Sequence, residues 1–201
     1  MDLQLTDKKV VVTGASKGIG LAIARAFASE GALVTLVARN DDALAKARGD
    51  MLAENLPGTQ TLATDLSTEA GREALFAAQS DADVLVNNAG AIKAGRLADL
   101  DMCDWREGWE LKVFGYIHLC KLYAAEMVKR KDGTIINIIG MGGRAVRPNY
   151  ICGAAGNAAL IGFTNALGAE TPQNNVRVFG INPSPTLTGR METMFRTRAQ
   201  E

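Results

Sequence analysis

The stretch KKVVVTGASKGIGLAIARAF, residues 8–27, decides the fold class of this chain. Its first part is a run of valines, which predicts a buried strand over 8–14, and its second part predicts a helix over 18–31. The loop between them, TGASKGIG (13–20), carries three glycines at the turn from strand to helix. Such a turn lets the backbone approach an anionic group at the helix N-terminus, where unpaired N–H groups and the helix dipole favour negative charge. We therefore expect a dinucleotide-binding loop, and the alternative is a turn that serves only helix–strand packing.

Segments rich in Val, Ile and Leu alternate with longer amphipathic segments along the rest of the chain. Helices are expected over 41–55, with Asn40 at its N-cap, and near 104–131 and 150–170. Five further strands are expected over residues 32–39, 59–66, 81–88, 133–140 and 175–182. Continuous apolar strands separated by helices are typical of a parallel sheet covered on both faces. The sequence thus predicts an α/β fold, a Rossmann-like doubly wound parallel sheet in three α/β/α layers, forming a single domain over residues 1–201.

The composition argues against several functional classes. Lys plus Arg and Asp plus Glu number 22 each, so no overall field attracts nucleic acid or an acidic membrane surface. No segment is expected to reach the ~18 apolar residues of a membrane span, and the first residues lack the pattern of a signal peptide. Cys103, Cys120 and Cys152 have no metal-like spacing and predict reduced thiols without a metal site. These features indicate a cytoplasmic protein.

The spacing of the glycines, G-x3-G-x-G, resembles the cofactor loop of the short-chain dehydrogenase/reductase family. Three further motifs follow in the family's order: Asp65 after the third strand, NNAG (87–90) after the fourth, and NPSPTLT (182–188) after the sixth, with Ser184 replacing the family's glycine. The resemblance covers nearly the whole chain. The cofactor-binding residues that it implies are Gly14, Ser16, Lys17, Gly18, Ile19, Gly20, Arg39, Asp65, Leu66, Asn88, Ala89, Gly90, Pro183 and Thr188.

The end of the second expected strand, Val37-Ala38-Arg39, indicates which cofactor is bound. An NAD-preferring Rossmann unit places an acidic side chain about 20 residues beyond the glycines, where it binds the ribose 2′-hydroxyl. No acid occupies that place here, and Arg39 together with Lys17 offers two cations for a 2′-phosphate. We therefore expect NADP(H) to be preferred, with NAD(H) still possible. The alternative is that both cations are solvated surface residues.

All the catalytic residues of the family are substituted. The family uses a tyrosine as general acid or base, a lysine four residues later that lowers its pKa, a serine at the end of the fifth strand and an asparagine in the preceding helix. Alignment of GNAALIGFTNAL (156–167) and GTIINIIGMGG (133–143) with the family's pattern places these roles at Gly153, Asn157, Gly140 and Lys112, in that order. The chain therefore resembles an atypical subgroup that lacks the usual Tyr-x-x-x-Lys pair.

The candidate catalytic residues are Lys112, Asn157 and Tyr150. Lysine and asparagine exchange places relative to the family, and the resemblance implies that the two positions are neighbours across the cofactor. The exchange would keep a cation beside the nicotinamide ribose, and the alternative is coincidence, with Lys112 an exposed helix residue. Tyr150 is the nearest phenol, but helical side chains lean toward the N-terminus, so its hydroxyl is expected to point away from the vacated site. His118 is expected on a different helix face from Lys112, in a structural role.

Two functions are compatible with these residues. One is an NADP(H)-dependent oxidoreductase that transfers a hydride between the cofactor and a small carbonyl or alcohol substrate, with a non-standard catalytic site. The other is an NADP(H)-binding sensor or regulatory protein without catalysis. The resemblance also implies a homodimer or homotetramer, formed through the helices near 104–131 and 150–170. The family continues beyond the sixth strand with a further helix and a seventh strand, so we expect either a truncated chain or an open sheet edge.

Overall fold

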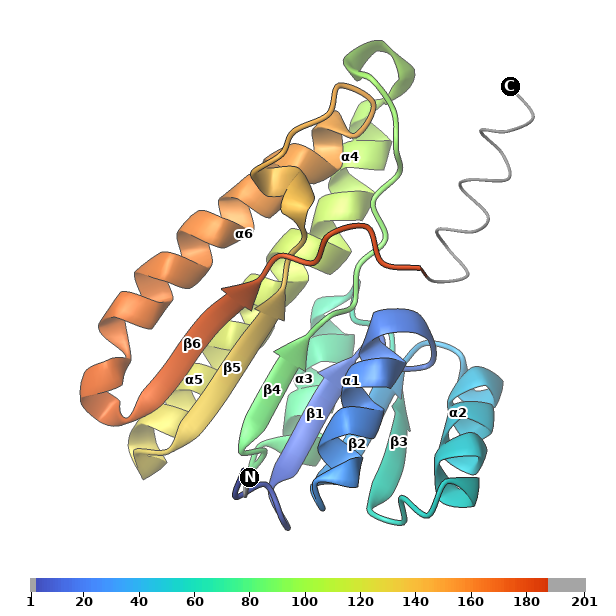
Figure 1. Ribbon diagram of the computed structural model, residues 1–201. Helices are drawn as coiled ribbons and strands as arrows, with labels where there is room; N and C mark the ends of the chain where they lie inside the picture. The colour runs from blue at the N-terminus through green and yellow to red at the C-terminus, as the bar shows by residue number, and fades with distance from the viewer. Residues whose placement is uncertain (1–2, 188–201) are drawn as a thin grey trace.

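A computed structural model describes residues 3–187, and its centre is a parallel sheet of six strands. The strands lie in the order β3-β2-β1-β4-β5-β6, so the chain starts inside the sheet and builds outward in both directions (Figure 1). The doubly wound order predicted from the sequence is thereby confirmed. The strands are β1 (Lys9–Thr13), β2 (Leu33–Ala38), β3 (Thr59–Ala63), β4 (Val84–Asn87), β5 (Gly133–Ile138) and β6 (Val176–Ile181).

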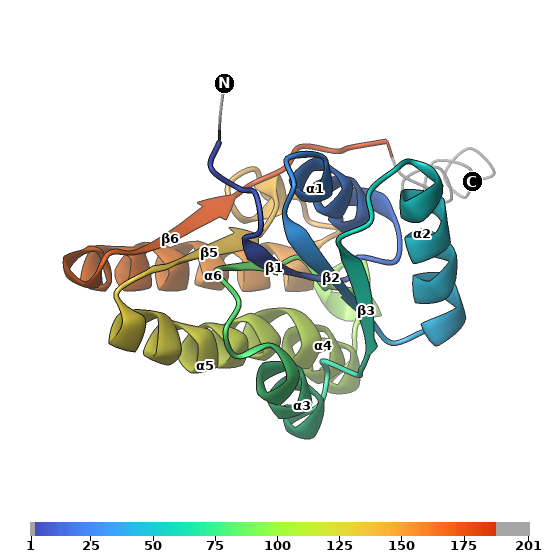
Figure 2. The same cartoon turned by 90° about the horizontal axis from the view of Figure 1, so that it is seen from below.

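Helices cover both faces of the sheet and give the three predicted layers (Figure 2). The valines of β1 alternate between these layers: Val10 and Val12 pack in the core beneath one pair of helices, and Val11 packs with Leu119 on the opposite face. A strand buried on both faces is apolar at every position, which explains the run of valines. On one face lie α1 (Gly18–Ser29) and α2 (Asp41–Ala53), and on the other α3 (Glu69–Gln79), α4 (Met102–Trp109), α5 (Gly115–Arg130) and α6 (Ile151–Glu170).

The ends of several helices and strands are set by residues that can be recognised in the sequence. The Asn40 side chain accepts a hydrogen bond of 2.7 Å from the backbone N–H of Ala43 and caps α2, as expected. Gly31 has a φ of +85°, in the left-handed region, and follows the end of α1. Every observed strand is shorter than its predicted range, because the flanking polar and glycine residues already belong to the connecting loops.

The long helix expected near 104–131 is interrupted, which corrects the prediction from sequence. It consists of α4, a π-turn η2 (Glu110–Phe114) and α5. At the end of the π-turn the Gly115 N–H donates to the Glu110 carbonyl, the i+5 bond that defines this conformation. Single π-turns are often found at functional sites, and Lys112 lies in this one.

α6 is both long and apolar. Its 20 residues are enough, by length and composition alone, to cross a membrane, so the expectation that no segment reaches this threshold is wrong. The helix packs on β6 and on the short turn η3 (Met141–Gly143), and it buries Leu160 and Thr164. A core helix passes the same test of length and composition, and one such helix does not establish a membrane span.

β6 is the outermost strand on its side of the sheet within residues 3–187. Its Phe179 and Ile181 side chains are each 45% exposed. Whether a further strand pairs with β6 in the protein stays a prediction, as does the open edge.

Candidate functional site

The glycine loop joins β1 to α1 at the carboxyl edge of the sheet, and its shape depends on the absence of side chains. Gly14 and Gly18 have φ values of +66° and +60°, in the left-handed region that favours glycine. A Cβ on Gly20 would collide with the Gly14 carbonyl and with the side-chain amide of Asn88. The close approach of α1 to the ends of the strands therefore requires glycine at this position.

The first turn of α1 is suited to a phosphate group. Lys17 is the N-cap residue, in an extended conformation, and no side chain caps the first N–H groups of the helix. These donors and the helix dipole favour an anion, and Ser16 and Ile19 flank the same turn. The residues present thus fit the pyrophosphate of a dinucleotide.

Thr13, the last residue of β1, organises the NNAG segment and was missed in the sequence. Its Oγ1 accepts hydrogen bonds from the backbone N–H groups of Asn88 (2.8 Å) and Ala89 (3.0 Å) and donates to the Val86 carbonyl (3.3 Å). The Asn88 side chain donates in return to the carbonyls of Thr13 (2.9 Å) and Gly14 (3.2 Å). Asn88 therefore supports the glycine loop. A polar residue closing an apolar strand is the signal that could have identified Thr13.

Asp65 and Arg39 lie together at the ends of β3 and β2. Asp65 Oδ1 accepts hydrogen bonds from the backbone N–H (3.0 Å) and the hydroxyl (2.8 Å) of Ser67. These bonds, with a smaller contribution from the charge of Arg39, hold the pKa of Asp65 below its ordinary value. Arg39 and Lys17 are both exposed. Their cationic groups are therefore accessible to a ligand at this edge of the sheet.

The other residues predicted to bind the cofactor differ in which of their groups could contact it. The Leu66 side chain is buried in the core, at 4% exposure, so the residue can reach a ligand only through its backbone. The Pro183 carbonyl accepts a hydrogen bond of 3.1 Å from the N–H of Met141, which places it beside η3. Thr188 lies outside the described residues.

Lys112 reaches from the π-turn to the end of β5. Its Nζ donates a hydrogen bond of 2.7 Å to the Ile139 carbonyl. Its stem runs over Gly90, where a Cβ would lie 2.9 Å from the Lys112 Cδ atom. The Tyr116 ring centroid is 5.9 Å from Nζ. Lys112 is thus a half-buried cation at the carboxyl edge of the sheet, next to Gly140, where the resemblance places the family's serine.

Asn157 approaches the same strand end from α6. The residue is only 2% exposed, and its Oδ1 has no hydrogen-bond partner within the described residues. Its amide nitrogen lies 3.3 Å from the position of a Cβ on Gly140 and 3.4 Å from that of a Cβ on Gly142. A buried, unpaired carbonyl oxygen is unfavourable, so this atom is suited to accept a hydrogen bond from a hydroxyl group or a water molecule.

The Tyr150 ring lies where a side chain at position 153 would be, which corrects the expectation that its hydroxyl points away from this place. A Cβ on Gly153 would lie only 2.0 Å from Tyr150 Cζ, the carbon that carries the hydroxyl. The rule for helical side chains does not apply, because Tyr150 is the N-cap of α6, with φ −140° and ψ 34°. The hydrogen bond from the Gly95 N–H to the Asn149 carbonyl, 2.8 Å long, holds this segment against the loop after β4.

Two other groups near the site have structural roles. Tyr116 is buried, and its hydroxyl donates a hydrogen bond of 3.0 Å to the Ile138 carbonyl. Burial, with smaller effects of Cys120 and Tyr150, raises the pKa of Tyr116, so this phenol stays protonated. His118 of α5 accepts a hydrogen bond of 3.1 Å from Arg72 of α3, in line with the structural role expected for it.

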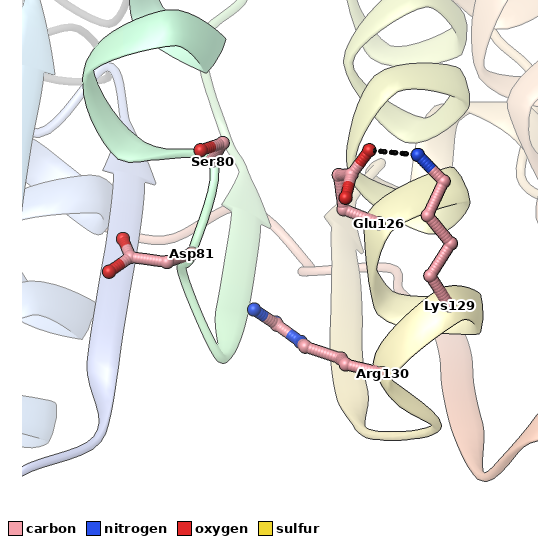
Figure 3. Close-up of a pocket in the computed structure, with 5 residues that line it drawn as sticks. All are labelled: Ser80, Asp81, Glu126, Lys129 and Arg130. Atoms are coloured by element: carbon pink, nitrogen blue, oxygen red, sulfur yellow. Dashed lines mark hydrogen bonds and ion pairs between the residues drawn. The ribbon is translucent and has the colours of Figure 1, made fainter.

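A hollow of about 340 Å³ lies at the opposite end of the sheet and is no candidate site (Figure 3). Its charged groups are paired within the protein: Glu126 binds Lys129, Asp81 binds Lys9, and Arg130 donates to the Ala82 carbonyl. The residues that line it are Ser80, Asp81, Glu126, Lys129 and Arg130. With its charges satisfied in this way, the hollow offers little to a ligand.

The comparisons with known proteins agree with this geometry. A family model described as "short chain dehydrogenase" matches residues 8–199. The chain belongs to the short-chain dehydrogenase family. A curated relative of this short-chain dehydrogenase, the uncharacterized oxidoreductase YvrD of Bacillus subtilis (strain 168), is 31% identical over 207 residues, covering 100% of this chain and 76% of the relative.

Two solved structures are also similar to this short-chain dehydrogenase. L-sorbose reductase from Gluconobacter frateurii, complexed with NADPH and L-sorbose, is 31% identical with a TM-score of 0.92, covering 100% of this chain and 78% of that one. A 3-oxoacyl (acyl-carrier-protein) reductase from Agrobacterium tumefaciens, with NADP bound, is 26% identical with a TM-score of 0.90, covering 98% and 77%. The resemblance seen in the sequence motifs is therefore confirmed at the level of the family and the fold.

Proposed function

We propose that this short-chain dehydrogenase is an NADP(H)-dependent oxidoreductase that acts on a small carbonyl or alcohol group with a rebuilt acid–base site. The observation that carries the proposal is the convergence of Lys112, Asn157 and Tyr150 on the end of β5 and the start of α6. The NADPH and NADP in the related structures support the choice of cofactor. We propose further that residues 1–201 form one nucleotide-binding domain, working as a cytoplasmic homodimer or homotetramer.

The cofactor is assigned to the edge formed by β1, β2 and β3. The glycine loop and the first turn of α1 would hold the pyrophosphate through backbone N–H groups. Arg39 and Lys17 would bind the 2′-phosphate, the arginine through its planar fork and the lysine as a point charge. The bound cofactor supplies a hydride, and the residues described next supply the remaining groups.

The chain's own residues provide the charge and the proton that a reduction needs. Negative charge develops on a carbonyl oxygen as it is reduced, and a fixed cation nearby stabilises that charge. Lys112 holds such a cation at the Ile139 carbonyl, beside Gly140. Tyr150 presents its phenol over Gly153, from where it can donate the proton. Asn157 is assigned to accept a hydrogen bond from a substrate or cofactor hydroxyl, because its buried Oδ1 has no partner within the described residues.

The test is NADPH oxidation over a panel of aldehydes and ketones, with protein already shown to bind NADPH. Lys112→Ala and Tyr150→Phe are each expected to lower kcat by about 10²–10⁴-fold, the usual contribution of a positioned acid–base group. The Kd for NADPH should change by less than about threefold, because neither residue belongs to the proposed phosphate site. Lys46→Ala, an exposed cation on α2 paired with Asp50, serves as the control that should change neither value. Unchanged kcat in Tyr150→Phe would remove the phenol from the mechanism.

An NADP(H)-binding protein without turnover is the second candidate, and one observation favours it. Gly140 and Gly153 carry neither of the hydroxyl groups that the family uses at these positions. This function predicts NADPH binding with no oxidation across the panel. It also predicts that Lys112→Ala and Tyr150→Phe alter only the affinity for NADPH.

A further inference from the structure

Arg72 is a buried arginine of α3 that lies outside the candidate site. Only 6% of its side chain is exposed. Its Nη1 donates to the Leu66 carbonyl (3.0 Å) and the Glu110 carbonyl (3.5 Å), and its Nη2 donates to Glu110 Oε1 (3.0 Å). Its Nε donates to His118 Nδ1 (3.1 Å). One guanidinium thus joins the segment after β3, the first residue of the π-turn and α5.

Stability alone does not explain why this charge is buried. A buried guanidinium is costly unless its donors are satisfied and its charge is compensated. Among the described residues, the carboxylate paired with Arg72 is that of Glu110, which is 44% exposed. Replacing a buried ion pair by apolar side chains often leaves a protein equally stable or more stable. We therefore look for the role of Arg72 in the positions of the groups that it binds.

The bonds of Arg72 converge on the residue that opens the π-turn. The Glu110 carbonyl accepts both the Gly115 N–H and Arg72 Nη1, while the Glu110 carboxylate accepts Nη2. Without this support the turn could relax to ordinary helical bonding, which would shift the register by one residue. A shift of one residue rotates a side chain by about 100° around the helix axis. Lys112 would then lose its position over Gly90 and its hydrogen bond to Ile139.

The acidic side chains near His118 do not turn this cluster into a metal site. Glu69, Glu73 and His118 place donor atoms within 4.8 Å of one another, which by distance alone would suit a cation. Because Arg72 donates to His118 Nδ1, the neutral imidazole carries its proton on the other ring nitrogen. The ring then has no lone pair left for a metal ion. Its function in this cluster is to accept the hydrogen bond of Arg72.

We propose that Arg72 is a positioning residue that acts through Lys112. It holds the π-turn in register and thereby sets the place of the Lys112 ammonium group at the end of β5. The proposal rests on the proposed function, in which that ammonium stabilises the developing charge of the substrate. Arg72 itself touches neither Lys112 nor the strand end through any of its four hydrogen bonds.

Chemical labelling of Lys112 tests the placement without any need for turnover. Purified protein is pulsed with acetic anhydride, and the acetylation rates of Lys112 and of the exposed Lys46 are compared by mass spectrometry. Arg72→Met is expected to raise the rate at Lys112 by about fivefold or more, since the local structure that protects the amine opens, and to leave Lys46 unchanged. Arg48→Met is the matched control, because it removes an arginine bound to one backbone carbonyl, that of Thr59, away from the site.

Kinetics then show whether the placement matters for catalysis. Arg72→Met should lower kcat by about 10²-fold, as expected when a catalytic group is displaced, with the Kd for NADPH within about threefold of wild type. In the Lys112→Ala background the same substitution should have no further effect on kcat, because the residue through which it acts is gone. Arg72→Lys keeps the charge but cannot reach all the acceptors, so it should give intermediate values.

The outcomes separate the two proposals. Equal labelling of Lys112 in folded Arg72→Met and wild type overturns the positioning role, whatever happens to kcat. If Arg72→Met does not fold, Arg72→Lys decides, and an unchanged labelling rate there has the same meaning. A wild type that binds NADPH but reduces no carbonyl overturns the proposed function, while a labelling rate that rises on substitution still supports the placement of Lys112 by Arg72.

Discussion

At the scale of single residues, polar groups surround Gly140 and Gly153, the two positions to which the resemblance assigns the family's catalytic hydroxyl groups. The Tyr150 ring lies where a side chain on Gly153 would be. The amide nitrogen of Asn157 lies 3.3 Å from the position that a Cβ on Gly140 would take. Lys112 brings a cation to the same strand end. Polar groups therefore reach the site from other positions of the chain, which is the physical reason to test it for turnover.

We predict that the choice of cofactor depends on Arg39. Arg39→Asp is expected to weaken NADPH binding by about tenfold to a hundredfold, because a charge-assisted hydrogen bond to phosphate is replaced by repulsion. NADH binding should be unchanged or tighter, since a carboxylate at this place can accept from the ribose 2′-hydroxyl. Fluorescence titrations with both cofactors give the two affinities.

The matched control for Arg39 is Lys129→Asp, the same reversal of charge at the opposite end of the sheet (Figure 3). It should leave both affinities unchanged, because a charge so far from the glycine loop is screened by salt. Equal affinity of wild type for NADPH and NADH would contradict the assignment of Arg39 and Lys17 to a 2′-phosphate.

At the scale of the elements, the start of α6 decides where the phenol lies. Gly153→Ala is expected to displace the Tyr150 ring, because the added Cβ would lie only 2.0 Å from its Cζ atom. The loss of kcat should approach that of Tyr150→Phe, while NADPH binding survives. The comparison is Gly49→Ala on α2, where an added Cβ meets nothing within 4 Å. That change should leave kcat unaltered and stabilise the protein by up to about 1 kcal/mol in urea unfolding, from helix propensity. Full activity in Gly153→Ala would show that the position of the ring is irrelevant.

The elements themselves were largely predictable, because their signals are local. The valines of β1, the cap at Asn40 and the left-handed Gly31 each act within a few residues of the chain, and the structure follows them. The interruption of the long helix was not predictable. It depends on Arg72, which lies in a different helix and whose role appears only once α3 is packed.

In the candidate site, too, the features set by local sequence were predictable, and those set by contacts between distant segments were not. The glycine loop follows from spacing, since backbone geometry and the helix terminus dictate it. The direction of Tyr150 was predicted wrongly because it depends on two features that sequence rules combine poorly, a non-helical N-cap and a glycine one turn later. Thr13 was missed because its role is to bond a segment about 75 residues away in the chain.

At the scale of the whole molecule, a buried polar chain ties the middle of the sheet to α6. Asn87 Nδ2 donates to Asn137 Oδ1 (2.9 Å), and Asn137 Nδ2 donates to Thr164 Oγ1 (2.9 Å). All three residues are almost fully buried. Asn87 Oδ1 has no partner within the described residues, but the hydrogen bonds that do form favour one arrangement of the core, because a slip would break them. These hydrogen bonds thus fix the position of α6 relative to β4 and β5, with Tyr150 at the start of the helix and Asn157 in its middle.

The outer surface of α6 is uncharged over most of its length. From Ile151 to Ala169 the helix has no charged residue, although Ala158, Ala159 and Gly162 are exposed. The neighbouring π-turn adds Phe114, which is 50% exposed. Exposed helix faces of monomeric proteins usually carry charges. A second copy of the chain that packs its α6, π-turn and α5 against their counterparts would bury this surface symmetrically.

We therefore predict that the protein self-associates through α6. Light scattering coupled to gel filtration should give a dimer or tetramer at micromolar concentration, and Ala159→Arg should convert it to a monomer, because a guanidinium cannot be buried unpaired in an apolar contact. Ala53→Arg places the same side chain on an exposed position of α2 and should leave the assembly unchanged. A monomeric wild type would contradict the prediction outright. An assembly that survives Ala159→Arg would place the contact elsewhere, with the edge strand β6 as the next surface to test, since unpaired strand edges also promote association.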